Sequence, residues 1–182
     1  MVDIVFDGSI TAGSAVLTAG LPIASGGTAS TTANAAKVAI SNCYFSAKST
    51  NSSQNNVTGD GTTYTCLFQT ENFDVGGDYV GSTGIFTAPV TGMYLFAVSI
   101  RTQDIVAHNS LNCTITNGVS GATELAVLDP SSIDDADNYV INASAFYRLT
   151  AAQTVTVQLT VSGSSKSIDV SGNSVFAGYL LG

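Results

Sequence analysis

The chain has 182 residues, of which 45% are apolar and only 10% are charged, so it can build a sizeable core and is not intrinsically disordered throughout. Five Lys and Arg residues stand against 13 Asp and Glu residues, which gives a net charge of −8. A chain this acidic repels phosphate backbones and anionic lipid surfaces, which argues against nucleic acid and membranes as partners.

Residues 1–40 differ in composition from the rest of the chain. They are rich in Gly, Ala, Ser and Thr and hold too few large apolar side chains for a separate core. We therefore predict an arm that becomes ordered against neighbouring subunits; a flexible linker is the alternative. The start carries Asp3 and Asp7 without an early positive charge, which is a poor match to a secretory signal. The Ala-rich stretch from Thr31 to Ile40 is the only plausible helix, and it is marginal in isolation.

The remainder of the chain reads as strands separated by turns. Residues 93–100 place large apolar side chains on one face and smaller ones on the other, and residues 155–161 alternate strictly between apolar and polar. Residues 174–181 are apolar on both faces, as expected of a strand in the middle of a sandwich or between the core and a subunit interface. Frequent Gly, Asn and Asp turn signals between short strands favour a β sandwich. No apolar run is long enough for a transmembrane helix.

The chain carries few residues suited to catalysis. Its one histidine, His108, has no cysteine beside it, and no G-x-S-x-G motif surrounds a serine. We therefore predict no enzyme and no catalytic or cofactor-binding residue, and we expect His108 to be exposed in a loop or at a strand end. Zinc-binding and nucleotide-binding motifs are missing as well.

Cys43, Cys66 and Cys113 are an odd number at wide spacing. Two arrangements are open: one disulfide with a free thiol, or three buried thiols that act as small apolar side chains. We favour the second.

Two kinds of residue invite a binding site. Asp129, Asp134, Asp135 and Asp137 form an oxygen-rich segment of the sort that binds Ca²⁺, with the last three as candidate ligands. Their spacing does not match a defined calcium loop, so we favour a solvated turn. Aromatic residues at strand positions are expected in the core or an interface. Three tyrosines lie nearer to turn signals and are the candidates for exposed rings on which a sugar could stack: Tyr64, Tyr79 and Tyr139.

The stretch from Phe68 to Ile100 closely resembles the complement C1q globular-head family, which is related to tumour necrosis factor. The matching elements are Phe68, Asn72, Tyr79, Thr83-Gly84, Phe86, Ala88-Pro89, Gly92, Tyr94 and Phe96. Residues 151–159 and 174–181 look like the last two strands of that family, so the resemblance covers about residues 41–182. The segment from Thr102 to Asn142 matches the family only loosely, and no collagen-like stalk is seen. The resemblance implies a ten-stranded antiparallel jelly roll that forms a tight trimer through apolar faces. On that basis we expect the core and trimer contacts to include Phe86, Tyr94, Phe96, Val175, Phe176, Gly178, Tyr179 and Leu180.

Residues 21–37 resemble a short module of phage tail fibres, in which a Leu-Pro or Ile-Pro step precedes Gly-Gly-Thr-Gly and an Ala-rich segment. Here Gly26, Gly27 and Thr28 keep the pattern, Ala29 replaces the third glycine, and the closing Leu-Gly step is missing. Glycines without a Cβ would let three backbones approach closely near a threefold axis.

Together these features predict a non-enzymatic, all-β homotrimer on the surface of a bacteriophage particle, made in the host cytoplasm. The arm (residues 1–40) would contact other virion proteins of the tail or capsid, and the jelly-roll head (residues 41–182) would bind a host-surface glycan or protein through multivalent contacts. A fibre or spike for host attachment is our first hypothesis, and a capsid decoration protein is the second. The rival from another class is a secreted complement-like lectin or ligand, for which neither a signal peptide nor a collagen repeat is seen.

Overall fold

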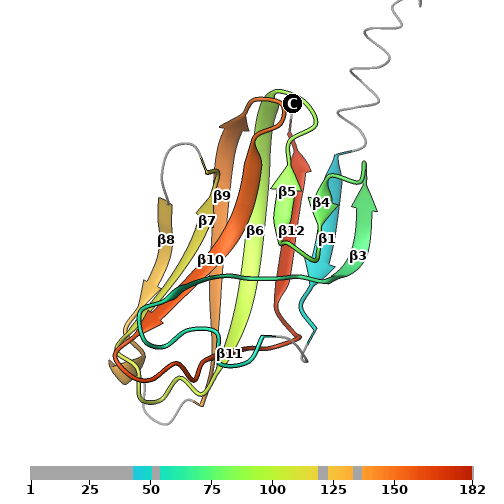
Figure 1. The fold of residues 1–182 in the computed structure, drawn as a ribbon. Coiled ribbons are helices and arrows are strands. Elements are labelled where there is room, and N and C mark those ends of the chain that lie inside the picture. Colours follow the sequence, from blue (N-terminus) through green and yellow to red (C-terminus); the bar gives the residue numbers. More distant parts are fainter. Residues whose placement is uncertain (1–42, 51–53, 119–122, 133–136, 182) are drawn as a thin grey trace, which may run out of the picture. The chain divides into compact units, whose positions relative to one another are not determined.

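The computed structural model describes residues 43–50, 54–118, 123–132 and 137–181 (Figure 1). The three segments predicted as strands lie in β6, β10 and β12, as expected. The predicted arm, the Ala-rich stretch and Gly26, Gly27 and Thr28 lie outside the described residues. The described residues form these strands and one 3-10 turn: β1 (Tyr44–Lys48), β2 (Thr63–Thr65), β3 (Thr70–Val75), β4 (Tyr79–Val80), β5 (Ile85–Thr87), β6 (Gly92–Gln103), β7 (Ser110–Thr116), β8 (Thr123–Leu128), η2 (Pro130–Ser132), β9 (Asn138–Leu149), β10 (Thr154–Ser162), β11 (Asp169–Val170) and β12 (Val175–Leu180).

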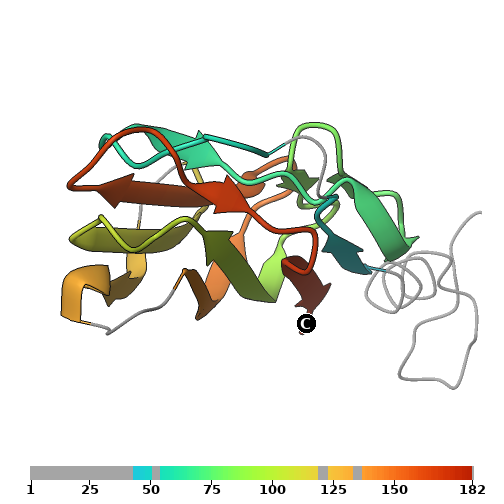
Figure 2. The same cartoon turned by 90° about the horizontal axis from the view of Figure 1, so that it is seen from below.

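The strands form two antiparallel sheets stacked as a sandwich (Figures 1 and 2). In the first sheet, β9 and β12 flank β6, β1 follows β12, β3 lies at the far edge, and the short β11 also pairs with β6. The second sheet has the order β4-β5-β10-β7-β8, with β2 paired to β10. The fold is thus the expected all-β sandwich. The expected count of ten strands is not confirmed, because the described residues form twelve, two of which contain only two residues each.

Strand periodicity explains which side chains enter the core. Successive residues of a strand point to opposite faces, and in β6 the residues Tyr94, Phe96 and Ile100 are fully buried whereas Ala97 is exposed. In β10 the same alternation buries its Val and Leu side chains and leaves Thr and Gln on the outer side. The apolar face of each sheet therefore packs against that of the other.

An aromatic cluster fills the centre of the sandwich. The ring of Phe45 stacks on Tyr79 with a centroid separation of 4.6 Å and lies 5.0 Å from Phe176. Gly178 pairs with Phe45 on one side and Phe96 on the other, so the glycine leaves room for both rings. We expected Tyr79 to be exposed, and this is wrong: it is only 3% exposed because its ring is part of this stack.

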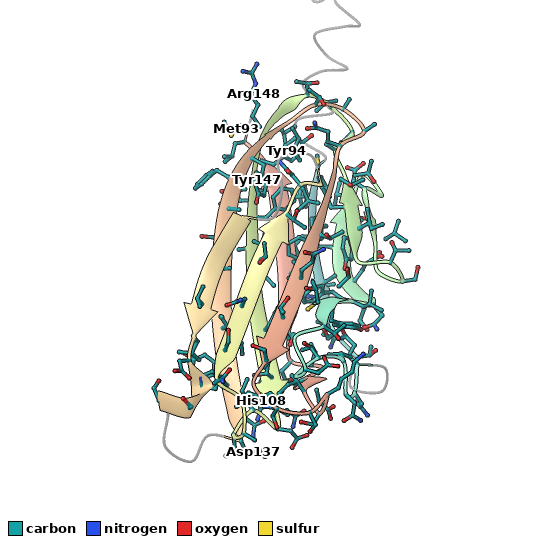
Figure 3. All side chains as sticks on the ribbon, turned by 60° about the vertical axis from the view of Figure 1, so that its left-hand side comes forward. Met93, Tyr94, His108, Asp137, Tyr147 and Arg148 are labelled. Carbon is teal, nitrogen blue, oxygen red and sulfur yellow. The ribbon has the colours of Figure 1, made fainter. Side chains whose placement is uncertain are left out.

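The two ends of the sandwich differ. Tyr44 at the start of β1 pairs with Tyr179 near the end of β12, so both described ends of the chain lie at one end of the sandwich, which we call the terminal end. Arg148 and Met93 also lie there, whereas His108 and Asp137 lie at the opposite end, which we call the loop end (Figure 3). The loop end is built by turns that connect the long strands.

The expectation that His108 is exposed is also wrong. Its side chain is 1% exposed, with Nδ1 3.3 Å from the carbonyl oxygen of Ile105 and Nε2 3.1 Å from that of Ser165. Gly59, with φ +133°, allows a third loop to approach the ring, since a Cβ there would lie 2.7 Å from Nε2. The histidine thus joins loops that are distant in sequence.

The three cysteines are free and buried, as favoured from the sequence. Burial raises the pKa of Cys43 and of Cys113 to about 12 and raises that of Cys66 well above its usual value. Cys66 and Cys113 lie on opposite sides of β10, because the first bonds to Val157 and the second pairs with Leu159. Two strand spacings of about 4.8 Å each therefore separate Cys66 from Cys113. This exceeds the distance of about 7 Å between Cα atoms that a disulfide can span, so these two cysteines cannot form one.

Candidate functional site

The most distinctive surface is the outer side of the first sheet, which we call the β6 face. Alternate residues of β9, β6, β12, β1 and β3 point outward on it. Large apolar side chains that are at least 40% exposed gather there: Tyr44, Phe73, Met93, Val140, Phe146 and Tyr179. Contiguous exposed apolar surface of this kind marks an interaction site in a soluble protein.

The strand register orders these side chains in a row across the sheet. Phe146 on β9 pairs with Leu95 on β6, Leu95 pairs with Tyr179 on β12, and Tyr179 pairs with Tyr44 on β1. At the edge of the sheet, Phe73 meets Tyr44 edge to face at 5.8 Å between ring centroids. The row therefore spans the whole width of the β6 face.

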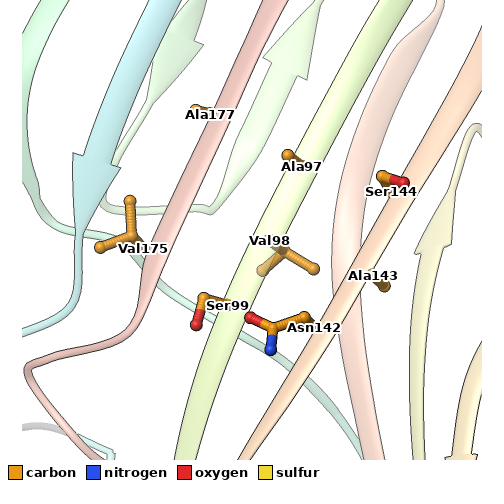
Figure 4. A pocket seen from close by; sticks show the side chains of 8 residues that line it. All are labelled: Ala97, Val98, Ser99, Asn142, Ala143, Ser144, Val175 and Ala177. Atoms are coloured by element: carbon orange, nitrogen blue, oxygen red, sulfur yellow. The ribbon is translucent and has the colours of Figure 1, made fainter.

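A groove of about 370 Å³ lies along this row on the side of β1 and β12. Tyr44, Phe73 and Tyr179 form its aromatic walls, and Leu95 and Ala177 contribute to its lining. A second, open depression of about 580 Å³ lies closer to the loop end, where the outward residues of β6, β9 and β12 are small (Figure 4). The side chains there include Ala97, Ser99, Ser144 and Ala177. The β6 face is thus aromatic toward the terminal end and hollowed in its middle.

Basic side chains are concentrated on the same face. Lys48 on β1, Arg101 on β6 and Arg148 on β9 occupy outward positions, which places three of the four Lys and Arg residues that the structure describes on this side. Arg101 donates a hydrogen bond from Nη2 to Oδ1 of Asn138, at 3.2 Å. In a chain with a net charge of −8, these three residues supply most of the positive charge that the structure describes.

Two carboxylates lie at the terminal end, in the turn that follows β3 and on the core side of the first sheet. The carboxylate of Asp74 accepts hydrogen bonds from the backbone nitrogens of Asp78 and Tyr79, at 3.3 and 3.0 Å, and so closes the turn between β3 and β4. Burial raises the pKa of Asp78, and the nearby charge of Asp74 adds to this, although a hydrogen bond with Cys43 opposes it. Asp74 pairs with the buried Phe45, so its side chain points to the core side of the sheet, whereas Phe73 beside it points outward.

The outer side of the second sheet has a different chemistry. Its outward positions on β10 and β7 carry Thr, Ser, Asn and Gln, as in Thr156, Gln158 and Thr160. The hydroxyls of Thr63 and Thr160 are hydrogen-bonded at 2.8 Å. Among the described side chains this side is mainly polar and uncharged, with Val127 as an isolated exposed apolar residue, so it forms no aromatic row like that of the β6 face.

The structure separates the eight residues predicted for the core and trimer contacts. Phe86, Tyr94, Phe96, Phe176, Gly178 and Leu180 are buried within the sandwich, whereas Val175 and Tyr179 point outward on the β6 face. Sequence reasoning did not single out Tyr44 and Phe73, because β1 has only five residues and begins with two adjacent aromatic residues, and the alternation around Phe73 covers only four residues. Phe146 was expected in the core or an interface, and its side chain is 66% exposed.

The predicted Ca²⁺ ligands lie only partly within the described residues. Among the described residues, no group of three or more His, Cys, Asp or Glu side chains is arranged to hold a metal ion. Asp137 is exposed at the loop end, whereas Asp134 and Asp135 lie outside the described residues (Figure 3). Within the same described ranges, no helix has the length and hydropathy that a membrane crossing requires.

Known proteins share this fold. The globular domain of zebrafish complement 1qA is similar with a TM-score of 0.58 and 19% identity, over 78% of this chain and 98% of that one. Murine APRIL is similar with a TM-score of 0.51 and 13% identity, over 74% of this chain and 95% of that one. No curated protein matches the chain. The model of the C1q domain matches residues 44–181, which is most of the chain, and the chain therefore belongs to the C1q domain family.

Proposed function

We propose that this protein is a homotrimeric, non-enzymatic surface protein of a bacteriophage particle, whose jelly-roll head serves attachment to the host surface. The observation that carries the assembly is the β6 face, where aromatic residues such as Phe73 and Phe146 are 48% and 66% exposed in a single chain. Three copies that close around an axis would cover this face, in line with the trimer that the C1q resemblance implies.

The position of the chain ends supports a projecting head. The segment before Cys43 joins the head at the terminal end, so anchoring through that segment would direct the loop end away from the particle. The loop end exposes short polar residues such as Asn109, Ser131 and Ser164. Uncharged hydroxyl and amide groups suit the hydrogen-bonding groups of sugars or protein surfaces, and repetition around the axis would add avidity to weak contacts.

The assignment to a phage rests on a separate observation, the Gly-Gly-Thr module at residues 21–37, which resembles a module of tail fibres. In this proposal the segment contacts other virion proteins of the tail or capsid, and Gly26 and Gly27 allow close approach of three chains. Replacement of both glycines by valine should abolish assembly. Unchanged assembly of that variant would contradict the role of the module.

Two experiments test the proposal at separate levels. Sedimentation equilibrium at micromolar concentration should show a trimer, and a stable folded monomer would refute the assembly. Cryo-electron microscopy of particles that carry the protein should show its density at the tail. Density on threefold or quasi-threefold axes of the capsid would establish a decoration role instead, and absence from particles would leave a secreted lectin or ligand as the better hypothesis.

A further inference from the structure

We propose that Phe146 on β9 of one copy inserts into the groove lined by Tyr44, Phe73 and Tyr179 of the neighbouring copy. The inference rests on the trimer proposed above and names the pairing that would hold it together. The occupant of the groove is thus a second copy of this chain, which contributes a side chain that the groove lacks by itself.

Cyclic symmetry requires two different complementary patches on each chain. In a closed ring of three, every contact is head to tail, so a surface does not meet its own copy as it does in a twofold dimer. The described residues provide such a pair. Phe146 is the most exposed large apolar side chain among them, at 66%, between the exposed Ser144 and Arg148, and the groove of about 370 Å³ is the apolar hollow on the same face.

Phe146 cannot fill the groove of its own chain. The strands β6 and β12 separate β9 from β1, so three strand spacings of about 4.8 Å put roughly 14 Å between the backbones at Phe146 and Tyr44. Outward-facing side chains of neighbouring strands stand side by side, so Phe146 does not extend across β6 and β12 to reach β1. Phe146 of the same chain thus stands beside Leu95 at one edge of the groove and does not reach its β1 side, which a phenylalanine from another copy can occupy.

The heights of the two patches agree. A closed ring has no translation along its axis, so if the strands run along the axis, residues at equal height meet. Phe146, Leu95, Tyr179 and Tyr44 lie in one row of the register, which places Phe146 level with the groove.

Cysteine cross-linking of the full chain tests the pairing directly. The double variant Phe146→Cys/Tyr44→Cys, oxidised under mild conditions, should form disulfide-linked dimers and trimers on a non-reducing gel. A disulfide within one chain is excluded, because its Cα atoms must lie within about 7 Å. The control Val127→Cys/Tyr44→Cys, with its new thiol at a residue that is 61% exposed on the outer side of the second sheet, should stay monomeric on the same gel.

A second variant tests the energetic role of the phenylalanine. Phe146→Ser should keep the circular dichroism spectrum of the folded protein. It should weaken the association of the trimer by about tenfold or more, because burial of a Phe side chain contributes about 1.5–3 kcal/mol. Val127→Ser is the matched control and should associate as the wild type does. A trimer without cross-links, or one insensitive to Phe146→Ser, would overturn the pairing alone, whereas a monomeric wild type would overturn the trimer as well.

Discussion

Replacement of Gly178 by alanine should destabilise the head through the aromatic cluster. A Cβ on this residue would lie 2.6 Å from Cδ1 of Phe96 and 2.8 Å from Cε1 of Phe45, against about 3.5–4.0 Å for an ordinary carbon contact. Neither ring can move freely, because both are 1% exposed or less and pack against Phe176. Overpacking of this kind costs about 1–3 kcal/mol, and since two rings must shift we expect about 2–3 kcal/mol.

Calorimetry at fixed protein concentration should then show a Tm lowered by about 4–12 °C. The control is Gly77→Ala: Gly77 has φ +71° and open space around it, so only backbone strain of about 1 kcal/mol is expected. In the double variant Gly178→Ala/Phe96→Leu the smaller side chain makes room for the new methyl group, so the combined loss should fall short of the sum by about 1 kcal/mol. Additive losses, or an unchanged Tm in Gly178→Ala, would refute the packing argument.

Three further predictions concern groups inside the sandwich. Because burial raises the pKa of Cys43 and Cys113 to about 12, a thiol reagent at pH 8 should label none of the three cysteines in the folded protein and all of them in denaturant; rapid native labelling would contradict this. Burial raises the pKa of Asp78, so its ionised form opposes folding, and the free energy of unfolding should rise as the pH falls through that raised pKa. Asp78→Asn should therefore stabilise the fold at pH 7 by less than about 1 kcal/mol and make urea unfolding less dependent on pH. A loss of stability in this variant would contradict the prediction. Tyr147→Phe removes the hydrogen bond that the Tyr147 hydroxyl donates to the carbonyl oxygen of Ile115 between the sheets, at 2.5 Å, and should lower the unfolding free energy by about 0.5–1.5 kcal/mol, which equal urea midpoints would disprove.

The long strands were predictable because their pattern is local. The alternation in residues 93–100 and 155–161 depends only on the pleat of a single strand, and the structure places these segments in β6 and β10. The doubly apolar end of the chain also had a clear meaning. In β12, Phe176 faces the core and Tyr179 faces outward, so each side of the strand has its own apolar partner or surface.

Burial at the loops was not predictable by the same reasoning. Tyr79 follows the turn signal Gly76-Gly77-Asp78, which favoured exposure, and yet the ring stacks on Phe45, which lies 34 positions earlier in the chain. His108 lies in a turn and is buried by the carbonyl oxygen of Ser165, 57 residues away. Such contacts come from loops that the sandwich brings together, and a local pattern carries no trace of them.

The sequence by itself determined that the head is a β sandwich and which of its long strands have a buried side, and it favoured buried thiols over a disulfide for the three cysteines. The tertiary structure alone decided which outward-facing residues come together. Tyr44, Tyr179, Leu95 and Phe146 belong to four strands spread over the chain and form one row only through the register of β1, β12, β6 and β9. The physical reason is that side-chain alternation is a property of one strand, whereas a binding surface depends on which strands become neighbours.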